Sequence, residues 1–491
     1  MTSPASPPSP APPSSLTVLG YDGSPLIPEA LELLGRASLV VGGRRHLDAV
    51  PVPPDARRIV LGGLQAALDA IDTELDLDDG AEHHVVVVAS GDPGFFGIVR
   101  ALRERGRRPR VIPALSSVQL AFARAGLSWD DALVVTAHGR ELRRAVNACR
   151  AHPKVAVLTA PGAGPAELGR ALFPQTPRTF VVCEDLGGPG ERVVRVRPAE
   201  ATTRHWRDPN VVLVLDMRRI AAAAAGGERG WIAGARPGPE RWALPSEEFA
   251  HGGAALTASA RGGRSRRAAR AGRHAGAGTG GGAVAGAEVR AVVLARLGPR
   301  IGDMVWDVGS GRGEIAIECA RFGAAAVAVD RDEAVCELIR ANVRAHRVKV
   351  AVARGTVPGV LEHLPDPDAV FVGGGGPEAV RACAARALRC VVATVTDPDR
   401  VQGVIDALEG ESLVARAVGL SAAPFGSDRP APVYVVWGER PGAVTRTVER
   451  RGRAVPQRPP ASAPVTVAEL PDFPDFPDRP GPGGGPGGGA R

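Results

Sequence analysis

The feature that most constrains the fold is a glycine-rich turn between two apolar runs in the C-terminal half of this 491-residue chain. The run Val305–Val308 leads into Gly309-Ser-Gly-Arg-Gly313, and a second run, Val327–Val329, ends at Asp330. This order predicts a buried strand, a tight turn, a helix and a second strand, because glycine permits such turns and lets the backbone approach a ligand closely. The helix start offers unpaired N–H groups to an anion, and an acid ending the second strand can accept ribose hydroxyls. The pattern therefore predicts an α/β domain that binds a nucleoside cofactor.

The spacing of the glycines separates the candidate cofactors. Gly-x-Gly-x-Gly at 309–313 differs from the Gly-x-Gly-x-x-Gly fingerprint of dinucleotide-binding folds, so a nicotinamide or flavin is the second hypothesis and a ligand-free turn the third. The turn resembles the first motif of the Rossmann-like methyltransferases, which bind S-adenosylmethionine (SAM). This resemblance implies a class I SAM methyltransferase fold for residues 287–440.

Residues 16–217 carry a different arrangement of apolar runs and glycine turns. Short apolar runs alternate there with helical patterns, which predicts another α/β domain. The runs are Leu16–Leu19, Leu39–Val41, Val85–Ala89, Leu133–Thr136, Val155–Thr159, Phe180–Cys183 and Val211–Leu215. Glycine- and serine-rich turns follow several of them: Gly20-Tyr-Asp-Gly23, ASGDPGFFG (89–97), PALSS (113–117), AHGR (137–140) and CEDLGGPGERV (183–193).

In this order, these turns resemble the tetrapyrrole methylase family, and among its members the corrin-pathway enzyme that methylates C5. The resemblance implies a fold of two α/β subdomains. Residues 287–438 are similar to the Rossmann-like enzymes that methylate C15 of the corrin precursor and remove its ring C acetate carboxyl. The segments that carry this second resemblance are 288–321, RGTVP (354–358) and LPDPDAVFVGGGG (364–376).

Together the two resemblances imply a reaction that uses two SAM molecules, one per domain. Precorrin-6B would be methylated at C5 and C15 and lose carbon dioxide, giving precorrin-8. Positioning a nucleophilic ring carbon in line with the methyl group can supply ~7–11 kcal/mol of the barrier, so no catalytic dyad is required. Pyridoxal phosphate is disfavoured because the only lysines are Lys154 and Lys349. We predict no metal, because the sole histidine pair, His83–His84, points to opposite faces of a strand.

The first resemblance implies roles for residues of the N-terminal domain. Asp22 is a candidate catalytic residue beside the transferred methyl, although an Asx turn is its alternative. Gly20, Gly23, His138 and Arg140 would border the substrate, and a structural hydrogen bond is the alternative for the last two. The cofactor would be held by Gly91, Asp92, Pro93, Gly97, Ser116 and Ser117.

The second resemblance implies roles for residues of the C-terminal domain. Asp307 would receive the ammonium of SAM, or instead fix the glycine turn. Asp330 would accept the ribose hydroxyls. Gly374, in the run Gly373–Gly376, would lie at the pocket floor near the reacting carbon. The remaining cofactor contacts would come from Gly309, Ser310, Gly311, Gly313, Thr356 and Val357.

Composition predicts the segments outside these domains. Residues 1–15 and the Pro/Gly-rich 441–491 are predicted to be a disordered leader and tail. A linker is predicted over 218–286; its part from Trp231 to Phe249 keeps enough apolar residues to pack on a neighbour, and it is Arg/Gly-rich from about 252.

Charge and composition bear on partners. Six arginines between 258 and 287 account for most of the net charge of +7; without them it would be +1. A basic arm of an RNA methyltransferase is one alternative, but aromatic residues for stacking bases make up only 4% of the chain. A non-catalytic tetrapyrrole carrier is another. We expect a cytoplasmic homo-oligomer with buried, reduced cysteines, no membrane or nucleic-acid partner, and other corrin-pathway enzymes as candidate partners.

The chain departs from the family at two places. Gly286–Ala287 replace a Thr-Lys pair that lies over the cofactor in the family, so either the linker is rebuilt or 258–286 is a frame-slipped translation. Arg312 interrupts the glycine turn, and a cation near a sulfonium is unfavourable unless it faces solvent or pairs with an acid. We therefore predict intact C5 methylation and a slower C15 half.

Overall fold

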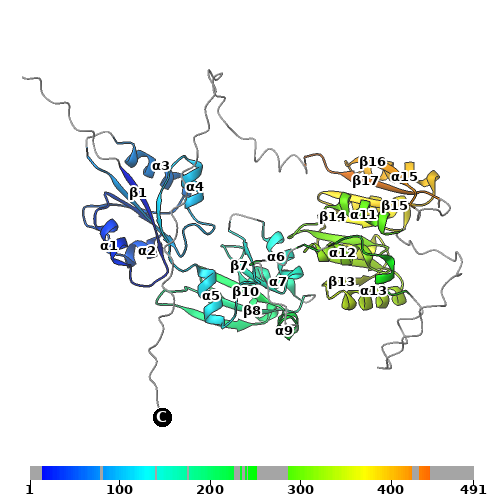
Figure 1. Ribbon diagram of the computed structural model, residues 1–491, viewed down its shortest axis with the longest axis horizontal. Helices are drawn as coiled ribbons and strands as arrows, with labels where there is room; N and C mark the ends of the chain where they lie inside the picture. Colours follow the sequence, from blue (N-terminus) through cyan, green and yellow to red (C-terminus); the bar gives the residue numbers. More distant parts are fainter. Residues whose placement is uncertain are drawn as a thin grey trace, which may run out of the picture. The chain divides into compact units, whose positions relative to one another are not determined.

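The structure, a computed structural model, describes residues 14–77, 81–138, 141–173, 176–225, 233–234, 238–239, 241–251, 286–422 and 431–442. These residues form three β-sheets with helices packed on them (Figure 1). All six cysteines are buried free thiols, as predicted. Across the described ranges, none of the helices has the length and apolar character needed to cross a bilayer.

The first sheet is parallel, in the order β3-β2-β4-β1-β5. Its strands are β1 (Ser15–Tyr21), β2 (Leu39–Gly42), β3 (Arg57–Val60), β4 (His84–Ser90) and β5 (Arg110–Ile112), and its helices are α1 (Pro28–Gly35), α2 (Arg44–Ala49), α3 (Leu64–Leu75) and α4 (Val99–Glu104). In β4, Val85 and Val87 pack with α3 and α4, while Val86 and Val88 pack with α1 and α2. This alternation buries both faces of the sheet. Because the strands are parallel, the loops that follow them lie together at the carboxyl edge of the sheet.

The second sheet is mixed, in the order β6-β7-β10-β8-β9. Its strands are β6 (Leu133–Thr136), β7 (Lys154–Leu158), β8 (Thr179–Glu184), β9 (Arg192–Val196) and β10 (Asn210–Leu215). The helices are α5 (Ser117–Ala125), α6 (Leu142–Ala151), α7 (Pro165–Leu172), α8 (Pro198–Ala201) and α9 (Met217–Ala225). Val118 and Phe122 of α5 pack on one face, and α6, α7 and α8 on the other. The two predicted α/β subdomains are thus confirmed.

The third sheet has the order β13-β12-β11-β14-β15-β17-β16, with β17 antiparallel to both neighbours. Its strands are β11 (Met304–Val308), β12 (Ala325–Asp330), β13 (Val350–Arg354), β14 (Ala369–Val372), β15 (Cys390–Val395), β16 (Val414–Leu420) and β17 (Val433–Glu439). Its helices are α11 (Ala287–Leu297), α12 (Glu314–Arg321), α13 (Glu333–Ala345), α14 (Gly376–Arg386) and α15 (Val401–Glu409), with short turns η2 (Gly359–His363) and η3 (Pro398–Arg400). Trp306 faces α14 and α15, whereas Val305 faces α11 and α12. This arrangement confirms the predicted Rossmann-like fold.

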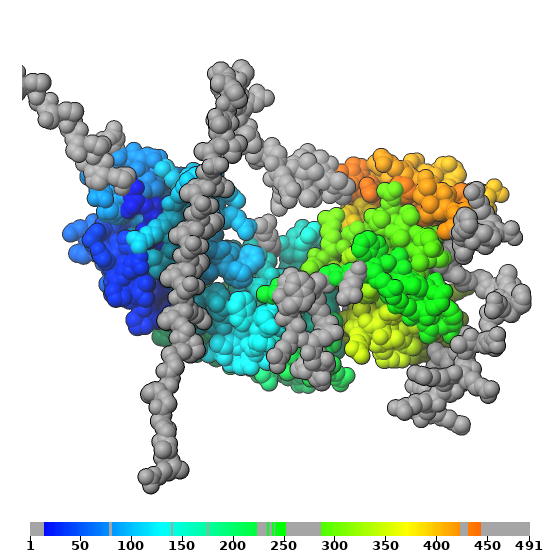
Figure 2. Space-filling model, viewed as in Figure 1, coloured from blue at the N-terminus to red at the C-terminus, as the bar shows by residue number. Residues whose placement is uncertain are grey.

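Residues 241–251, here called the strap, pack on this third domain and include η1 (Ser246–Glu248). Leu244 and Phe249 are 3% and 1% exposed and lie in one core with Ala328 of β12 and Ile339 of α13. In Figure 2 the strap, in green, lies against the light-green and yellow-green surface of the domain. Of the stretch 231–249, which was predicted to pack on a neighbour, Leu244 and Phe249 do so, and Trp231 and Ile232 lie outside the described residues.

The segments predicted as leader, linker and tail are only partly described. The first strand begins at Ser15, inside the predicted leader, and the range 218–286 contains most of α9 and the whole strap. The Arg-rich residues 252–285, residues 1–13 and residues 443–491 lie outside the described residues.

Candidate functional site

Three loops meet at the carboxyl edge of the first sheet. Strands β1 and β4 run in register to Tyr21 and Ser90, and the Gly91 amide donates to the Tyr21 carbonyl at 2.8 Å. A Cβ on Gly20 would overlap the Gly91 oxygen and lie 2.5 Å from the Ala114 nitrogen. The predicted turns at 20–23, 91–97 and 113–117 are therefore brought together, and the packing requires glycine at position 20.

The 91–97 loop is folded by its own contacts. Asp92 Oδ1 accepts the Gly94 amide at 2.8 Å, and a Cβ on Gly97 would overlap the carbonyl oxygen of the buried Pro93. The loop also lies against the start of α5, because a Cβ on Gly91 would lie 3.3 Å from the Ser117 nitrogen. These contacts fix the backbone of the loop beside the strand ends.

Ser116 and Asp22 both have structural contacts. The Ser116 hydroxyl accepts the Gln119 amide at 3.2 Å, and the Gln119 side chain accepts the Ser116 amide at 2.8 Å, which forms a capping box for α5. Asp22 Oδ1 accepts the Ser24 amide at 3.0 Å, and its Oδ2 accepts the Leu115 amide at 3.2 Å. The Asx-turn alternative for Asp22 is thus present, and the carboxylate also joins two loops of the site.

Three further residues of this half were predicted to border the substrate: Gly23, His138 and Arg140. Gly23 has φ +91°, and a Cβ there would overlap the Gly187 oxygen. His138 is exposed, and its amide donates to Thr136 Oγ1 at 3.2 Å. Next to it lies a hollow of about 580 Å³ lined by Ala137, Glu141, Leu142, Ala160, Pro161, Gly162 and Ala163. Arg140 lies outside the described residues.

A polar group beside this edge was missed by the sequence analysis. His46 on α2 is 8% exposed, and its Nε2 lies 3.1 Å from the Ser90 hydroxyl. Arg45 donates to His46 Nε2 at 3.1 Å and to the Ser90 oxygen at 3.0 Å. Burial and the Arg45 charge lower the pKa of His46 to about 4, so the imidazole is neutral at neutral pH. No sequence motif identifies His46 as a candidate site residue. It is identified only by its position in space, beside the end of a strand.

The glycine turn of the third sheet lies between two strand ends. The Gly309 and Ser310 amides donate to the Val329 carbonyl at 2.9 and 3.2 Å, and the Gly311 amide donates to Asp330 Oδ2 at 3.3 Å. On the other side, a Cβ on Gly309 would lie 3.1 Å from the Gly374 nitrogen. The structure thus brings the predicted turn, Asp330 and the 373–376 run to one edge.

Asp307 is buried beneath this turn. Its Oδ2 accepts the Ser310 hydroxyl at 2.7 Å and the Ala316 amide at 2.9 Å, which fixes the turn to α12. Among the described residues, its Oδ1 has no hydrogen-bond partner. Desolvation raises the pKa of this carboxyl to about 7. Asp307 therefore holds the turn through one oxygen, while its other oxygen could accept a donor from a ligand.

Asp330 connects the turn to the loop predicted to contact adenine. Its Oδ1 accepts the Asp332 amide at 3.1 Å, and its carbonyl accepts the Gly355 amide at 3.0 Å. Thr356, the next residue, is exposed, and Val357 packs against the core on the Trp306 face. A Cβ on Gly374 would meet nothing within 4 Å. A spare buried carboxylate oxygen, a second acid and open space beside glycine suit a nucleoside that carries an ammonium group.

Arg312, the departure in the turn, is paired with an acid. Its Nη2 lies 2.5 Å from Glu314 Oε1, and its Nη1 donates to the Ser246 carbonyl of the strap at 3.2 Å. A cation near a sulfonium was expected to be tolerable if it paired with an acid, and Arg312 does so.

Comparisons with known proteins match both halves of the chain. A family model described as "Precorrin methyltransferase domain" matches residues 279–420, and one described as "Tetrapyrrole (Corrin/Porphyrin) Methylases" matches residues 25–202. A precorrin-6Y C(5,15)-methyltransferase [decarboxylating] of Sinorhizobium sp is 32% identical over 376 residues, covering 74% of this chain and 79% of the relative. A cobalt-precorrin-7 C(5)-methyltransferase of Salmonella typhimurium is 32% identical over 212 residues, covering 41% of this chain and 100% of the relative. A probable cobalt-precorrin-6B C(15)-methyltransferase (decarboxylating) of Pyrobaculum calidifontis is 36% identical over 126 residues, covering 24% and 65%.

Proposed function

Because the chain belongs to the family of precorrin-6Y C5,15-methyltransferases (decarboxylating), we propose that it methylates precorrin-6B at C5 and C15 and removes the ring C acetate carboxyl, giving precorrin-8 and carbon dioxide. We assign C5 methylation to residues 16–217, and C15 methylation with decarboxylation to 287–440. The observation that supports this assignment is that each part has its own edge of strand ends, built by glycine turns of a different pattern. SAM, when bound at each edge, supplies an electrophilic methyl group.

In the N-terminal domain we propose a cofactor site made mostly of backbone. The loop containing Gly91, Asp92, Pro93 and Gly97 would wrap the cofactor, and Ser116 and Ser117 at the start of α5 would lie near its methionine end. Gly20 and Gly23 would border the tetrapyrrole together with His138 and Arg140. Because both Asp22 oxygens already accept backbone amides, we propose that Asp22 shapes the site rather than transferring a proton.

In the C-terminal domain we propose that Oδ1 of Asp307, which has no hydrogen-bond partner among the described residues, accepts the ammonium of SAM. Gly309, Ser310, Gly311 and Gly313 would hold the amino-acid part, since their turn lies at the start of α12. Asp330 would accept the ribose hydroxyls. Thr356 and Val357 would flank the adenine, and Gly374 would form the floor beside the reacting ring carbon.

The proposed reactions depend more on the position of the substrate than on proton transfer by side chains. Each methylation requires a ring carbon aligned with the methyl group, and such alignment alone is worth ~7–11 kcal/mol. In the decarboxylation, the electron pair of the breaking C–C bond passes into the conjugated imine system of the macrocycle, and the remaining methylene then takes up a proton from water to become a methyl group. The protein therefore has to orient the substrate and exclude water, which fits two edges lined by backbone and small residues.

Mass spectrometry of precorrin-6B incubated with the full chain and SAM tests the proposal. The expected product has gained two methyl groups and lost carbon dioxide. If RNA is added to the reaction, methylated bases or riboses would favour the alternative of an RNA methyltransferase. Tetrapyrrole that is bound but unchanged would favour a carrier. We also propose a homo-oligomer, which light scattering after size exclusion can check.

A further inference from the structure

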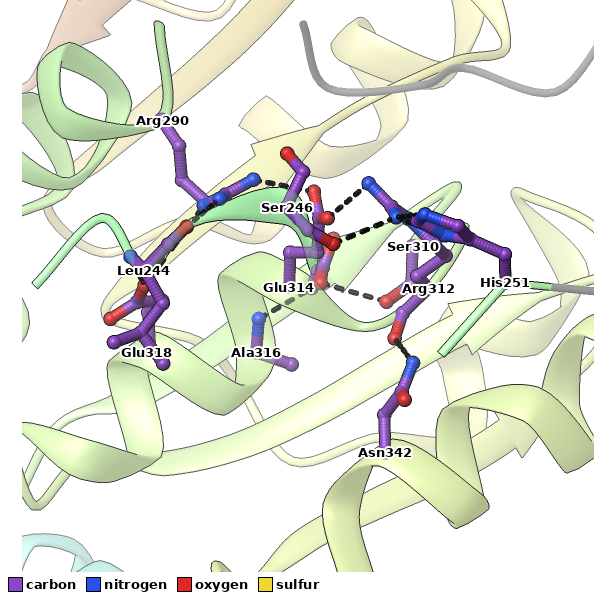
Figure 3. A network of polar contacts seen from close by, with 11 residues as sticks. Leu244, Ser246, His251, Arg290, Ser310, Arg312, Glu314, Ala316, Glu318 and Asn342 are labelled. Carbon is purple, nitrogen blue, oxygen red and sulfur yellow. Dashed lines mark hydrogen bonds and ion pairs between the residues drawn. The ribbon is translucent and has the colours of Figure 1, made fainter. Parts of the chain in front are cut away.

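The strap and the glycine turn of the C-terminal domain are joined by the side chain of Arg312. Besides pairing with Glu314 and the Ser246 carbonyl, its Nη1 lies 2.5 Å from His251 Nδ1 (Figure 3). The guanidinium can donate to this nitrogen only when the imidazole is neutral there. Arg312 thus lies within the cofactor turn while its charged end is held at the strap.

The backbone of the same residue is tied to the strap by Asn342 of α13. The Asn342 Nδ2 donates to the Arg312 carbonyl at 2.9 Å, and its Oδ1 accepts the Ala250 amide at 2.8 Å. Asn342 is 1% exposed, so both ends of its amide are committed in a buried place. An amide is suited to this bridge because it carries a donor and an acceptor on one planar group.

Beneath this bridge, a buried ion network anchors the strap to α12. Arg290 is fully buried; its Nη1 donates to Glu314 Oε2 at 2.7 Å, and its Nη2 donates to the Leu244 carbonyl. Glu318 Oε1 accepts the Leu244 amide at 2.7 Å. Burial raises the pKa of Glu314, and the charges of Arg290 and Arg312 oppose that rise. Glu314 therefore pairs with an arginine on each of its two oxygens.

We propose that Arg312 and Asn342 are positioning residues of the C15 site, which make the strap a structural part of the cofactor turn. Gly311 and Gly313 have φ +57° and +81°, conformations that glycine adopts readily, so Arg312 stands between two residues whose backbone has unusual freedom. The strap contacts hold this turn in the shape that accepts SAM. The guanidinium charge is directed to Glu314 and the strap, and does not act on the sulfonium. This inference rests on the function proposed above for the C-terminal domain.

Kinetics of the full chain test the proposal, with Arg312→Ala and Asn342→Asp as the variants. Aspartate can still accept the Ala250 amide but has no N–H for the Arg312 carbonyl. Carbon dioxide release reports the C-terminal half, and C5 methylation in the same tube is an internal control. We expect about a tenfold rise in the KM for SAM in carbon dioxide release, the effect of a lost charge-assisted or buried hydrogen bond, with kcat and C5 methylation nearly unchanged.

Arg321→Ala is the matched control. Arg321 donates to the strap carbonyl of Arg241 at 2.9 Å and pairs with Glu318, but these contacts lie away from the glycine turn. We expect its KM for SAM to stay within about twofold of the wild type. If the KM for SAM rose equally in Arg321→Ala and Arg312→Ala, the cause would be a general loosening of the strap. That result would overturn the proposal.

Calorimetric titration with SAM and with S-adenosylhomocysteine, which lacks the sulfonium charge, provides a readout besides activity. If Arg312 is a positioning residue, Arg312→Ala lowers the affinities for both ligands by the same factor at one of the sites. Tighter binding of SAM relative to S-adenosylhomocysteine would mean that Arg312 repels the sulfonium, and would contradict the proposal. A wild-type chain that binds both ligands but releases no carbon dioxide would contradict the proposed function and leave this comparison of affinities intact.

Discussion

The two strand-end edges proposed to bind SAM are supported in different ways. At the first sheet, loops at 20–23, 91–97 and 113–117 support one another through backbone contacts, as where Gly20 abuts Gly91 and Ala114. At the third sheet, the glycine turn is supported from outside by buried charged groups and by the strap. The first edge depends chiefly on close packing without Cβ atoms. At the second edge, a similar close approach of Gly309 to Gly374 is supplemented by side chains that are distant in sequence. Under the proposed function, two unrelated kinds of scaffold would hold the same methyl donor.

The largest expected effect concerns the strap. Phe249→Ala removes a buried ring that packs with Ile339 and lies 5.3 Å from the Arg290 guanidinium. We expect a loss of about 3–5 kcal/mol in the stability of the C-terminal domain. Native-state hydrogen exchange of the β11 and β12 amides would measure it. Trp242→Ala, at a strap residue that is 56% exposed, is the control and should cost under about 1 kcal/mol. Similar losses for both variants would show that the strap does not anchor the domain as described.

A smaller loss is expected from Gly20→Ala at the other edge. The added methyl group would overlap the Gly91 oxygen, so the 91–97 loop must move away from the site. We expect C5 methylation to fall by about a hundredfold in kcat/KM, while carbon dioxide release stays unchanged. Gly62→Ala, where a Cβ would meet nothing within 4 Å, should leave both activities intact. Equal loss of both activities in Gly20→Ala would break the distinction between the two edges.

The smallest effect is a pH dependence confined to the C-terminal site. Burial raises the pKa of Asp307 to about 7, so its ionised form, which can accept an ammonium, increases as pH rises through 7. From pH 6 to 7.5 the ionised fraction grows about eightfold, and SAM affinity should rise by up to that factor. The free energy of unfolding changes in the opposite direction. It falls as pH rises, because the pKa of this carboxyl is higher in the folded state than in the unfolded state.

Calorimetry across this range checks the Asp307 prediction, with Asp307→Asn as the variant that cannot ionise. The variant should bind SAM weakly and without this pH dependence. A wild-type affinity that is flat between pH 6 and 7.5 would show that Asp307 does not receive the ammonium.

Much of the fold could be predicted because the central strands are apolar and end in glycine turns. The runs now seen as β1, β2, β4, β8 and β10 are buried on both faces and stood out for that reason. The edge strands β3, Arg57–Val60, and β9, Arg192–Val196, were missed because each carries two arginines and an exposed face. Periodicity alone does not distinguish such segments from loops.

The candidate site could be predicted as far as its motifs reach. The family resemblance grouped Asp307, Asp330 and Gly374, and the structure places the strands that precede them side by side, so their ends meet at one edge. Their supports could not be predicted, because Asn342 and the strap reach the glycine turn only through tertiary packing. Arg290 illustrates this limit: in the sequence it is one of many arginines, and in the structure it is fully buried.

The central claim, that one chain holds two separate SAM sites, is tested most directly by the stoichiometry of S-adenosylhomocysteine binding. Calorimetry on the full chain should find two molecules bound per wild-type chain, and one each for the Gly20→Ala and Asp307→Asn variants at concentrations that saturate the unaltered site. A wild-type chain that binds only one molecule, lost in either variant, would contradict the account.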